Sequence, residues 1–214
     1  MVVSPKANGK LLAIACQDSG YALVLSQDSK KLLFDLKMNG SCSSVAIDPE
    51  ERYLFSVGDE ADIYQWDLKM RRCIGKVSDS GSFNTTKLAI SPNGQLLASG
   101  SKMGTVNLFH IDPLTQVIEP KAFKTVMNLT TAITDLKFNH TSELLTFCSK
   151  WKKNAFKMLH IPSYTVYQNF PGVAPGVLKY PFSLAFSHKS EFIAMGNDEG
   201  KAHLFQLDHF KPGI

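Results

Sequence analysis

The chain has 214 residues, of which 44% are hydrophobic and 20% are charged, and its formal net charge is +4. This composition is that of an ordinary globular protein and excludes a largely disordered chain. The positive charge is too small by itself to indicate a nucleic-acid-binding protein.

No targeting or membrane-spanning segment is expected. The longest apolar runs, such as residues 11–16, are far shorter than a membrane span. The first three residues lack the basic and apolar regions of a signal peptide. The four cysteines are far apart and form no Cys-x-x-Cys pair, so we expect reduced core thiols of an intracellular protein: Cys16, Cys42, Cys73 and Cys148.

A short apolar segment recurs five times along the chain, every 42 to 48 residues. Each copy reads as a buried strand. The five predicted strands cover residues 10–15, 52–57, 95–100, 143–148 and 191–196.

Each of these strands has predicted neighbours on both sides. Upstream strands that end at a turn are predicted at 43–49, 86–92, 134–140 and 182–188, with only Ser4 and Pro5 left in the first copy. Downstream strands are predicted at 61–68, 104–111, 154–161 and 200–207. The turns between them are rich in glycine, which favours tight connections, at Gly58, Gly100, Gly104, Gly196 and Gly200.

Helix should be nearly absent, because no stretch of ten residues carries an apolar stripe of helical period. Repeats of 40 to 45 residues built from short strands, with a Trp-Asp pair, are typical of WD-repeat β-propeller blades. Trp66 and Asp67 form this pair once. An apolar residue takes the packing position in three other copies, at Phe109, Leu159 and Phe205. The predicted fold is therefore an all-β WD-repeat propeller of about five blades.

The approximate repeats are residues 1–41, 42–84, 85–131, 132–178 and 179–214. The first begins inside a blade and the last stops after its third strand. We therefore expect an incomplete part of a larger, seven-bladed ring that lacks blades on its N-terminal side. The alternative is a true five-bladed ring. A partial ring made alone should expose edge strands and aggregate.

Motifs for catalysis or cofactor binding are missing from the sequence. It contains no nucleophile elbow and no His-Glu-x-x-His pair, and residues 100–104 do not match a phosphate-binding loop. His110, His160 and His203 recur in the third strands, where packing or solvent exposure is a better interpretation than metal binding. We expect no enzyme activity, no cofactor, no metal and no small-molecule substrate.

Two basic segments are candidate contacts for RNA or a protein partner. Residues 150–157 form a predicted turn in which Lys150, Lys152 and Lys153 surround Trp151. Lysines attract phosphates and an aromatic ring can stack on an unpaired base, although a plain solvated turn is the alternative. The weaker candidate is residues 69–76, which contain Lys69, Arg71, Arg72 and Lys76, since outer strands are often basic for solubility.

Longer stretches of the chain resemble one family. Residues 124–145, 163–171 and 196–210, together with 61–76 and 100–109, are similar in order and sequence to the U-three small nucleolar RNA-associated protein eighteen family, over about residues 60–214. The resemblance implies the C-terminal portion of a family whose members carry a longer N-terminal region and further blades.

The resemblance implies a nucleolar, nuclear scaffold of the small-subunit processome that supports pre-rRNA processing without catalysing it. Implied partners are other WD-repeat subunits of a pre-ribosomal assembly, with possible pre-rRNA or snoRNA contact and no membrane. A peptide- or substrate-reading propeller adaptor in a ubiquitin-ligase or chromatin complex is the alternative. A propeller hydrolase is a distant third.

Overall fold

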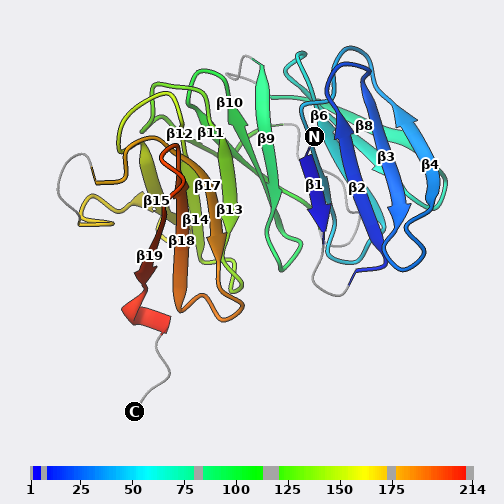
Figure 1. The fold of residues 1–214 in the computed structure, drawn as a ribbon. Helices are drawn as coiled ribbons and strands as arrows, with labels where there is room; N and C mark the ends of the chain where they lie inside the picture. Colours follow the sequence, from blue (N-terminus) through cyan, green and yellow to red (C-terminus); the bar gives the residue numbers. More distant parts are fainter. Residues whose placement is uncertain (1, 6–8, 80–83, 113–120, 173–176, 211–214) are drawn as a thin grey trace.

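The computed structural model describes residues 2–5, 9–79, 84–112, 121–172 and 177–210. These residues form five antiparallel sheets, which we number blades 1 to 5 in chain order (Figure 1). The one helical element in the described part of the chain is a short 3-10 turn, η1 (Asp208–Phe210). The prediction of an all-β chain nearly without helix is confirmed. No helix among the described residues has the length and apolarity needed to cross a membrane.

Four blades have four strands, hydrogen-bonded in chain order. Blade 1 contains β1 (Val2–Pro5), β2 (Leu11–Cys16), β3 (Tyr21–Ser26) and β4 (Leu32–Lys37). Blade 2 contains β5 (Ser44–Ile47), β6 (Tyr53–Val57), β7 (Asp62–Asp67) and β8 (Arg72–Ser78). Blade 3 contains β9 (Thr85–Ile90), β10 (Leu96–Ser101), β11 (Val106–His110) and β12 (Lys124–Val126).

Blade 4 contains β13 (Asp135–Phe138), β14 (Leu144–Cys148), β15 (Phe156–His160) and β16 (Thr165–Val166). Blade 5 has three strands, β17 (Pro181–Phe186), β18 (Phe192–Asn197) and β19 (Ala202–Gln206). The expectation that the last copy ends after its third strand is confirmed within the described residues. The expectation that the first copy begins inside a blade is wrong, because Val2–Pro5 pairs along its length with β2.

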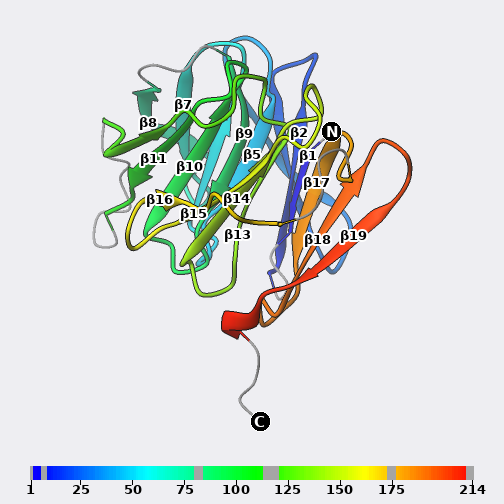
Figure 2. The same cartoon turned by 90° about the vertical axis from the view of Figure 1, so that its left-hand side faces the viewer.

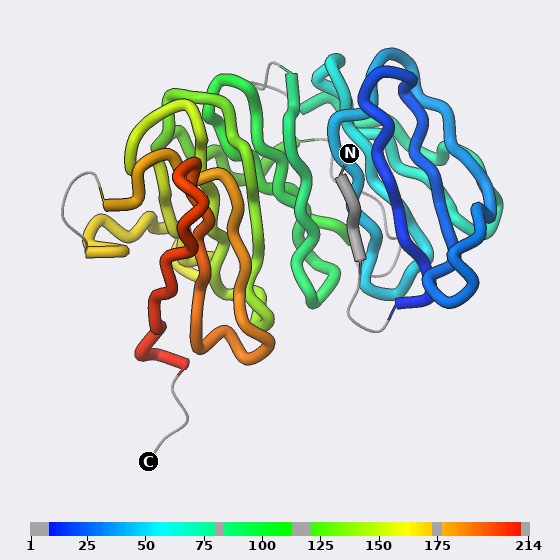
Figure 3. Tube along the Cα trace, in the orientation of Figure 1, coloured from blue at the N-terminus to red at the C-terminus, as the bar shows by residue number. Residues whose placement is uncertain are grey.

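The inner strands β1, β5, β9, β13 and β17 lie beside one another in this order, so the blades succeed each other around a common axis (Figure 2). The tube in Figure 3 shows blades 1 and 5 on opposite sides of the molecule, so the described blades form an open arc rather than a closed ring. This arrangement is a partial propeller.

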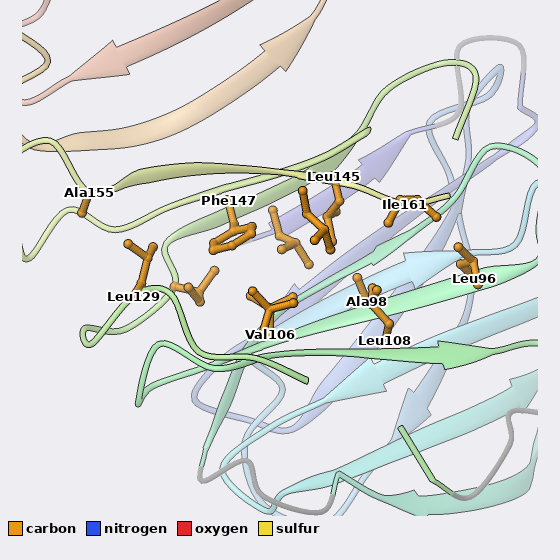
Figure 4. Close-up of a cluster of buried hydrophobic side chains, with 13 residues drawn as sticks. Leu96, Ala98, Val106, Leu108, Leu129, Leu145, Phe147, Ala155 and Ile161 are labelled. Atoms are coloured by element: carbon orange, nitrogen blue, oxygen red, sulfur yellow. The ribbon is translucent and has the colours of Figure 1, made fainter. Parts of the chain in front are cut away.

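The hydrophobic core lies between blades and not within them. Four buried clusters each combine side chains of two successive blades. Between blades 3 and 4, for example, Ala98 and Leu108 face Leu145 and Phe147, and all four are fully buried (Figure 4). A single blade is too thin to bury both of its apolar faces, so each blade depends on its neighbours.

Hydrogen bonds also join successive inner strands. The backbone N–H of Leu88 in blade 3 donates to Ser44 Oγ of blade 2 at 3.1 Å. The N–H of Leu184 in blade 5 donates to Asp135 Oδ2 of blade 4 at 2.8 Å. These bonds set the inner strands in register while the core clusters supply most of the burial.

Candidate functional site

The Trp-Asp pair lies at the centre of blade 2. The indole of Trp66 is only 6% exposed and its Nε1 donates to Ser56 Oγ on the neighbouring strand at 2.8 Å. Asp67 Oδ1 accepts the backbone N–H of Met70 at 2.7 Å and so stabilises the turn after β7. Both side chains have their polar groups directed at partners inside the blade.

A buried carboxylate that the sequence analysis did not identify stands in the loop between blades 2 and 3. Asp79 is 1% exposed and accepts hydrogen bonds from Thr85 Oγ1 at 3.0 Å, Ser99 Oγ at 2.7 Å and Asn107 Nδ2 at 2.7 Å. Ser99 has the same position in its repeat as Ser56, which is the sequence signal for this network. The geometry is that of a structural link, because all three donors belong to blade 3 or to its entry.

The glycines at the ends of the second strands serve close packing. A Cβ at Gly58 would lie 1.8 Å from the carbonyl oxygen of Ser41, and a Cβ at Gly100 would lie 2.8 Å from Cγ2 of Ile133. The sequence predicts a turn role for these residues and for Gly196, but none of the three has a positive φ, and Gly100 and Gly196 lie within β10 and β18. At Gly58 and Gly100 the absence of a side chain lets a neighbouring loop approach closely, the loop before blade 2 at Ser41 and the loop before blade 4 at Ile133.

Gly104 is a turn glycine in the predicted sense. Its φ is +86°, a conformation that favours glycine, and a Cβ there would meet the backbone of Leu129 at 2.6 Å. Gly200 has a φ of +74° in the corresponding turn of blade 5. Both residues close the connection between a second and a third strand.

The basic segment 69–76 lies on the β7–β8 hairpin, and part of its charge is already paired. Lys76 forms ion pairs with Asp62 at 2.7 Å and with Glu60 at 3.3 Å. Hydrogen bonding to Asp62 and then Tyr64 raises the pKa of Lys76. The guanidinium of Arg71 lies 4.9 Å from the ring centre of Phe34 in blade 1. Lys69 and Arg72 are exposed.

The basic segment 150–157 lies on the β14–β15 turn of blade 4 (Figure 1). Trp151 is 65% exposed, and the ammonium of Lys150 lies 5.0 Å from its ring centre. Lys152 is also exposed. The ammonium of Lys153 lies 5.9 Å from the ring centre of Tyr180, in the loop that enters blade 5. The turn and the adjacent loop therefore present two aromatic rings, each with a lysine of the turn above it.

The two basic segments cannot form one surface. In an antiparallel blade the connection between the second and third strands lies at one end of the sheet, and the connection between the third and fourth lies at the other. The β14–β15 turn is of the first kind and the β7–β8 hairpin of the second. They belong to opposite rims of the propeller, two blades apart.

The recurring histidines of the third strands contact their own blades. The ring of His110 stacks on Phe123 with centroids 3.9 Å apart, and His160 Nδ1 lies 2.7 Å from Ser163 Oγ. His203 Nε2 lies 3.4 Å from Asn197 Nδ2. Among the described residues, no group of three histidine, cysteine or acidic side chains is placed to hold a metal ion.

The four cysteines are free thiols. Burial raises the pKa of Cys42 to about 12, with a further contribution from Cys16. Burial, together with the nearby Asp135, also raises the pKa of Cys148. Raised thiol pKa values disfavour the thiolate, so Cys42 and Cys148 are unsuited to act as nucleophiles.

An apolar hollow of about 280 Å³ lies where blades 4 and 5 meet near η1. Its walls include Met158, Tyr167, Phe170 and Phe210, with Glu143 at its edge. This volume lies just below the usual range of small-molecule sites, which begins at about 300 Å³. The hollow would accommodate one or two apolar side chains, but nothing in its lining selects a particular ligand.

Comparison with known proteins agrees with the repeat pattern. The family described as "WD domain, G-beta repeat" matches residues 72–110, which run from β8 to β11. With five successive blades around one axis, the chain is part of a WD-repeat β-propeller.

Three relatives identify the resemblance more closely. The chain is 34% identical over 192 residues to the U3 small nucleolar RNA-associated protein 18 homolog of Homo sapiens, covering 90% of this chain and 34% of that protein. It is 40% identical over 194 residues to the homolog of Arabidopsis thaliana, covering 91% and 35%. It is 27% identical over 216 residues to the U3 small nucleolar RNA-associated protein 18 of Saccharomyces cerevisiae, covering 90% and 36%.

The resemblance to the U3 small nucleolar RNA-associated protein 18 family is therefore confirmed, and it covers more of the chain than residues 60–214. The chain spans about a third of the length of the curated relatives it matches.

Proposed function

We propose that this chain is part of a non-catalytic WD-repeat scaffold of the small-subunit processome, which supports pre-rRNA processing in the nucleolus. The observation that carries the proposal is the 34–40% identity, over about 90% of the chain, to proteins named for their association with the U3 small nucleolar RNA.

The structure supports a binding role. Blades held together by shared apolar clusters form a rigid support, and the turns between their strands project from it. Loops on a rigid scaffold are where recognition usually occurs. The polar side chains of the blade interiors, such as Asp79 and Trp66, are occupied by structural hydrogen bonds. Partners would be other WD-repeat subunits and RNA of the pre-ribosomal particle.

Purification of the tagged full-length gene product from nuclear extract tests the proposal. U3 RNA and pre-rRNA should be enriched with it, and its depletion should cause unprocessed small-subunit precursors to accumulate. Recovery of histone tails or degron peptides, without U3 RNA, would contradict the proposal and favour a peptide-reading adaptor.

A further inference from the structure

The β14–β15 turn lies between two loops, the one that enters blade 4 at Thr131 and the one that enters blade 5 at Lys179 and Tyr180. Together the turn and these two loops form a continuous strip of surface. Thr131 Oγ1 in the loop entering blade 4 donates to Ser149 Oγ at 2.7 Å, at the start of the turn. At its end, the N–H of Asn154 donates to the carbonyl of Lys179 at 2.7 Å. These bonds fix the turn against both neighbouring loops, so its exposed side chains project from a rigid base.

The two aromatic side chains of this strip are accessible to solvent, one largely and one in part. Trp151 is 65% exposed, which is unusual for a large aromatic side chain in a well-packed protein. Tyr180 is half-buried and supplies a second ring beside Lys153. An indole that contributes little to the core is available to stack on a planar partner.

The charges of the strip are available as well. None of the described residues places a carboxylate within ion-pair distance of Lys150, Lys152 or Lys153. On the blade 5 side, the carboxylate of Glu199 is paired with Lys179 at 3.3 Å and Lys201 at 3.0 Å. These pairs compensate its negative charge. A further carboxylate, that of Asp198, accepts the backbone N–H of Tyr180 at 3.2 Å, and the three lysines of the β14–β15 turn outnumber it, so the strip keeps an excess of positive charge.

We propose that Trp151 and Tyr180 stack unpaired bases of single-stranded RNA, while Lys150, Lys152 and Lys153 attract its phosphates. Stacking on an aromatic ring needs a base that is not paired, and lysines beside the rings hold the backbone without reading sequence. Double-stranded RNA hides its base faces and would use only the lysines. This inference rests on the proposed function and names the ligand class of one surface of that scaffold.

The probe is a fluorescein-labelled decamer of oligouridylate, titrated with the full-length gene product and followed by anisotropy. Trp151→Leu should weaken binding roughly 5- to 150-fold, which is the range for losing one stacked base. Trp151→Phe should retain much of the affinity. The affinity for a duplex of equal length should change little in either variant. Trp151→Leu is expected to fold normally because most of its side chain is exposed.

Salt dependence separates stacking from charge. Three phosphate contacts to single-stranded RNA predict a slope of about −2 in log K against log salt. Lys152→Gln should make this slope less steep by about 0.7, while Trp151→Leu should leave it unchanged. Lys31→Gln removes an exposed charge from the β3–β4 turn of blade 1, on the opposite rim, and is the matched control, with no change expected in the affinity or in the salt slope.

Tryptophan fluorescence gives a direct readout. The chain has two tryptophans, and Trp66 is buried, so quenching by unlabelled oligouridylate should report on Trp151. In the full-length gene product, the quenching that comes from Trp151 is the difference between the quenching of the wild type and that of Trp151→Leu. Unchanged affinity and quenching in Trp151→Leu would overturn the inference, as would equal effects on duplex and single strand. Such a result combined with enrichment of U3 RNA would leave the proposed function intact.

Discussion

Trp66 on β7 and Ser56 on β6 are joined by a 2.8 Å hydrogen bond from the indole Nε1 to the serine hydroxyl. The serine is fully buried and the indole nearly so, and the ring also stacks on Tyr64 with centroids 5.9 Å apart. Trp66 thus combines apolar burial at the interface of blades 1 and 2 with a satisfied polar group.

Trp66→Ala should therefore destabilise the protein by about 3–5 kcal/mol, the usual cost of removing a large buried aromatic side chain. Trp66→Phe keeps most of the buried area and should cost about 1–3 kcal/mol, because Ser56 loses its donor. Equilibrium urea unfolding, followed by circular dichroism, measures both values. A Trp66→Ala variant that unfolds like wild type but loses one partner would show that the side chain serves recognition.

Asp79 supplies a second test of the blade interior. Its carboxylate accepts three hydrogen bonds from buried donors in blade 3. Asp79→Ala should cost about 3–5 kcal/mol, since three polar groups lose their acceptor at once. Ser99→Ala removes one of the three donors and should cost about 1 kcal/mol. If both variants cost the same, the network would not act through the carboxylate.

The bounds of the second strands could be predicted from the sequence to within one residue. The buried hydrogen-bond network around Asp79 could not be predicted. Residues 95–100 were expected as a strand and β10 covers Leu96–Ser101, because the apolar Leu96–Ala98 segment recurs in each repeat at the centre of a strand that is buried on both faces. The fourth strands β12 and β16 have three and two residues, too few to show an alternation. Asp79 and Ser99 are 20 residues apart and meet only through the folding of blade 3, so the repeat position of Ser99 marks a buried serine but does not identify its partner.

In the candidate site, too, some features could be predicted from the sequence and others could not. Local sequence identifies Trp151 and its lysines as exposed turn residues, because the turn separates two recognisable strands. Tyr180 is 29 residues away in the next repeat, and its approach to Lys153 depends on the packing of blade 5 against blade 4. Contacts between side chains of different blades depend on how the blades pack around the axis, and the spacing of the repeats does not specify that packing in detail.

The contact between a turn of blade 4 and a turn of blade 5 predicts that its loss loosens blade 5 more than the other blades. Ser190 Oγ accepts the N–H of His140 in blade 4 at 3.1 Å and lies 2.6 Å from His140 Nδ1. Ser190→Gly suits the φ of +58° at this position but removes the hydroxyl. It should raise hydrogen exchange in β18 and β19 while leaving blades 1 to 3 unchanged. Uniform protection across all blades would show that this contact does not hold blade 5.

Close approach at Gly100 can be tested with a double-mutant cycle. Gly100→Ala places a Cβ 2.8 Å from Ile133 Cγ2 and should cost about 1–3 kcal/mol through overpacking. Adding Ile133→Ala should cost less than it does in the wild-type background, because the smaller side chain relieves the collision. Additive effects of the two substitutions on the free energy of unfolding would mean that the collision is avoided elsewhere.

The raised pKa of Cys42 predicts a pH dependence of stability. The folded state keeps this thiol protonated to about pH 12, while the unfolded chain loses the proton near the ordinary value of 9.0. Above that value the unfolded state binds fewer protons than the folded one, so this contribution to stability falls as the pH rises from 9 towards 12.

The difference in unfolding free energy between wild type and Cys42→Ala isolates this effect. It should be constant from pH 6 to 8 and decrease between pH 9 and 11. Packing lost in the variant contributes equally at every pH and does not change the slope. A difference that stays constant up to pH 11 would show that the thiol ionises as readily in the folded state.

The outer face of blade 5 predicts self-association of the isolated chain. Leu204 of the edge strand β19 is 66% exposed, and Phe182 of the inner strand β17 is 45% exposed. Among the described residues no strand pairs with the outer edge of β19. An open edge beside exposed apolar side chains is a template for pairing with another chain. Analytical ultracentrifugation of the 214-residue chain should therefore show association that grows with protein concentration.

Leu204→Lys places a charge on this edge strand and should lower the associated fraction without reducing the free energy of unfolding, because the side chain lies mainly in solvent. Met103→Lys, at an equally exposed methionine in the β10–β11 turn, is the matched control and should not change association. A monodisperse wild-type monomer that melts cooperatively would mean that the edge of β19 is protected. Equal effects of the two substitutions would point to net charge rather than to this edge.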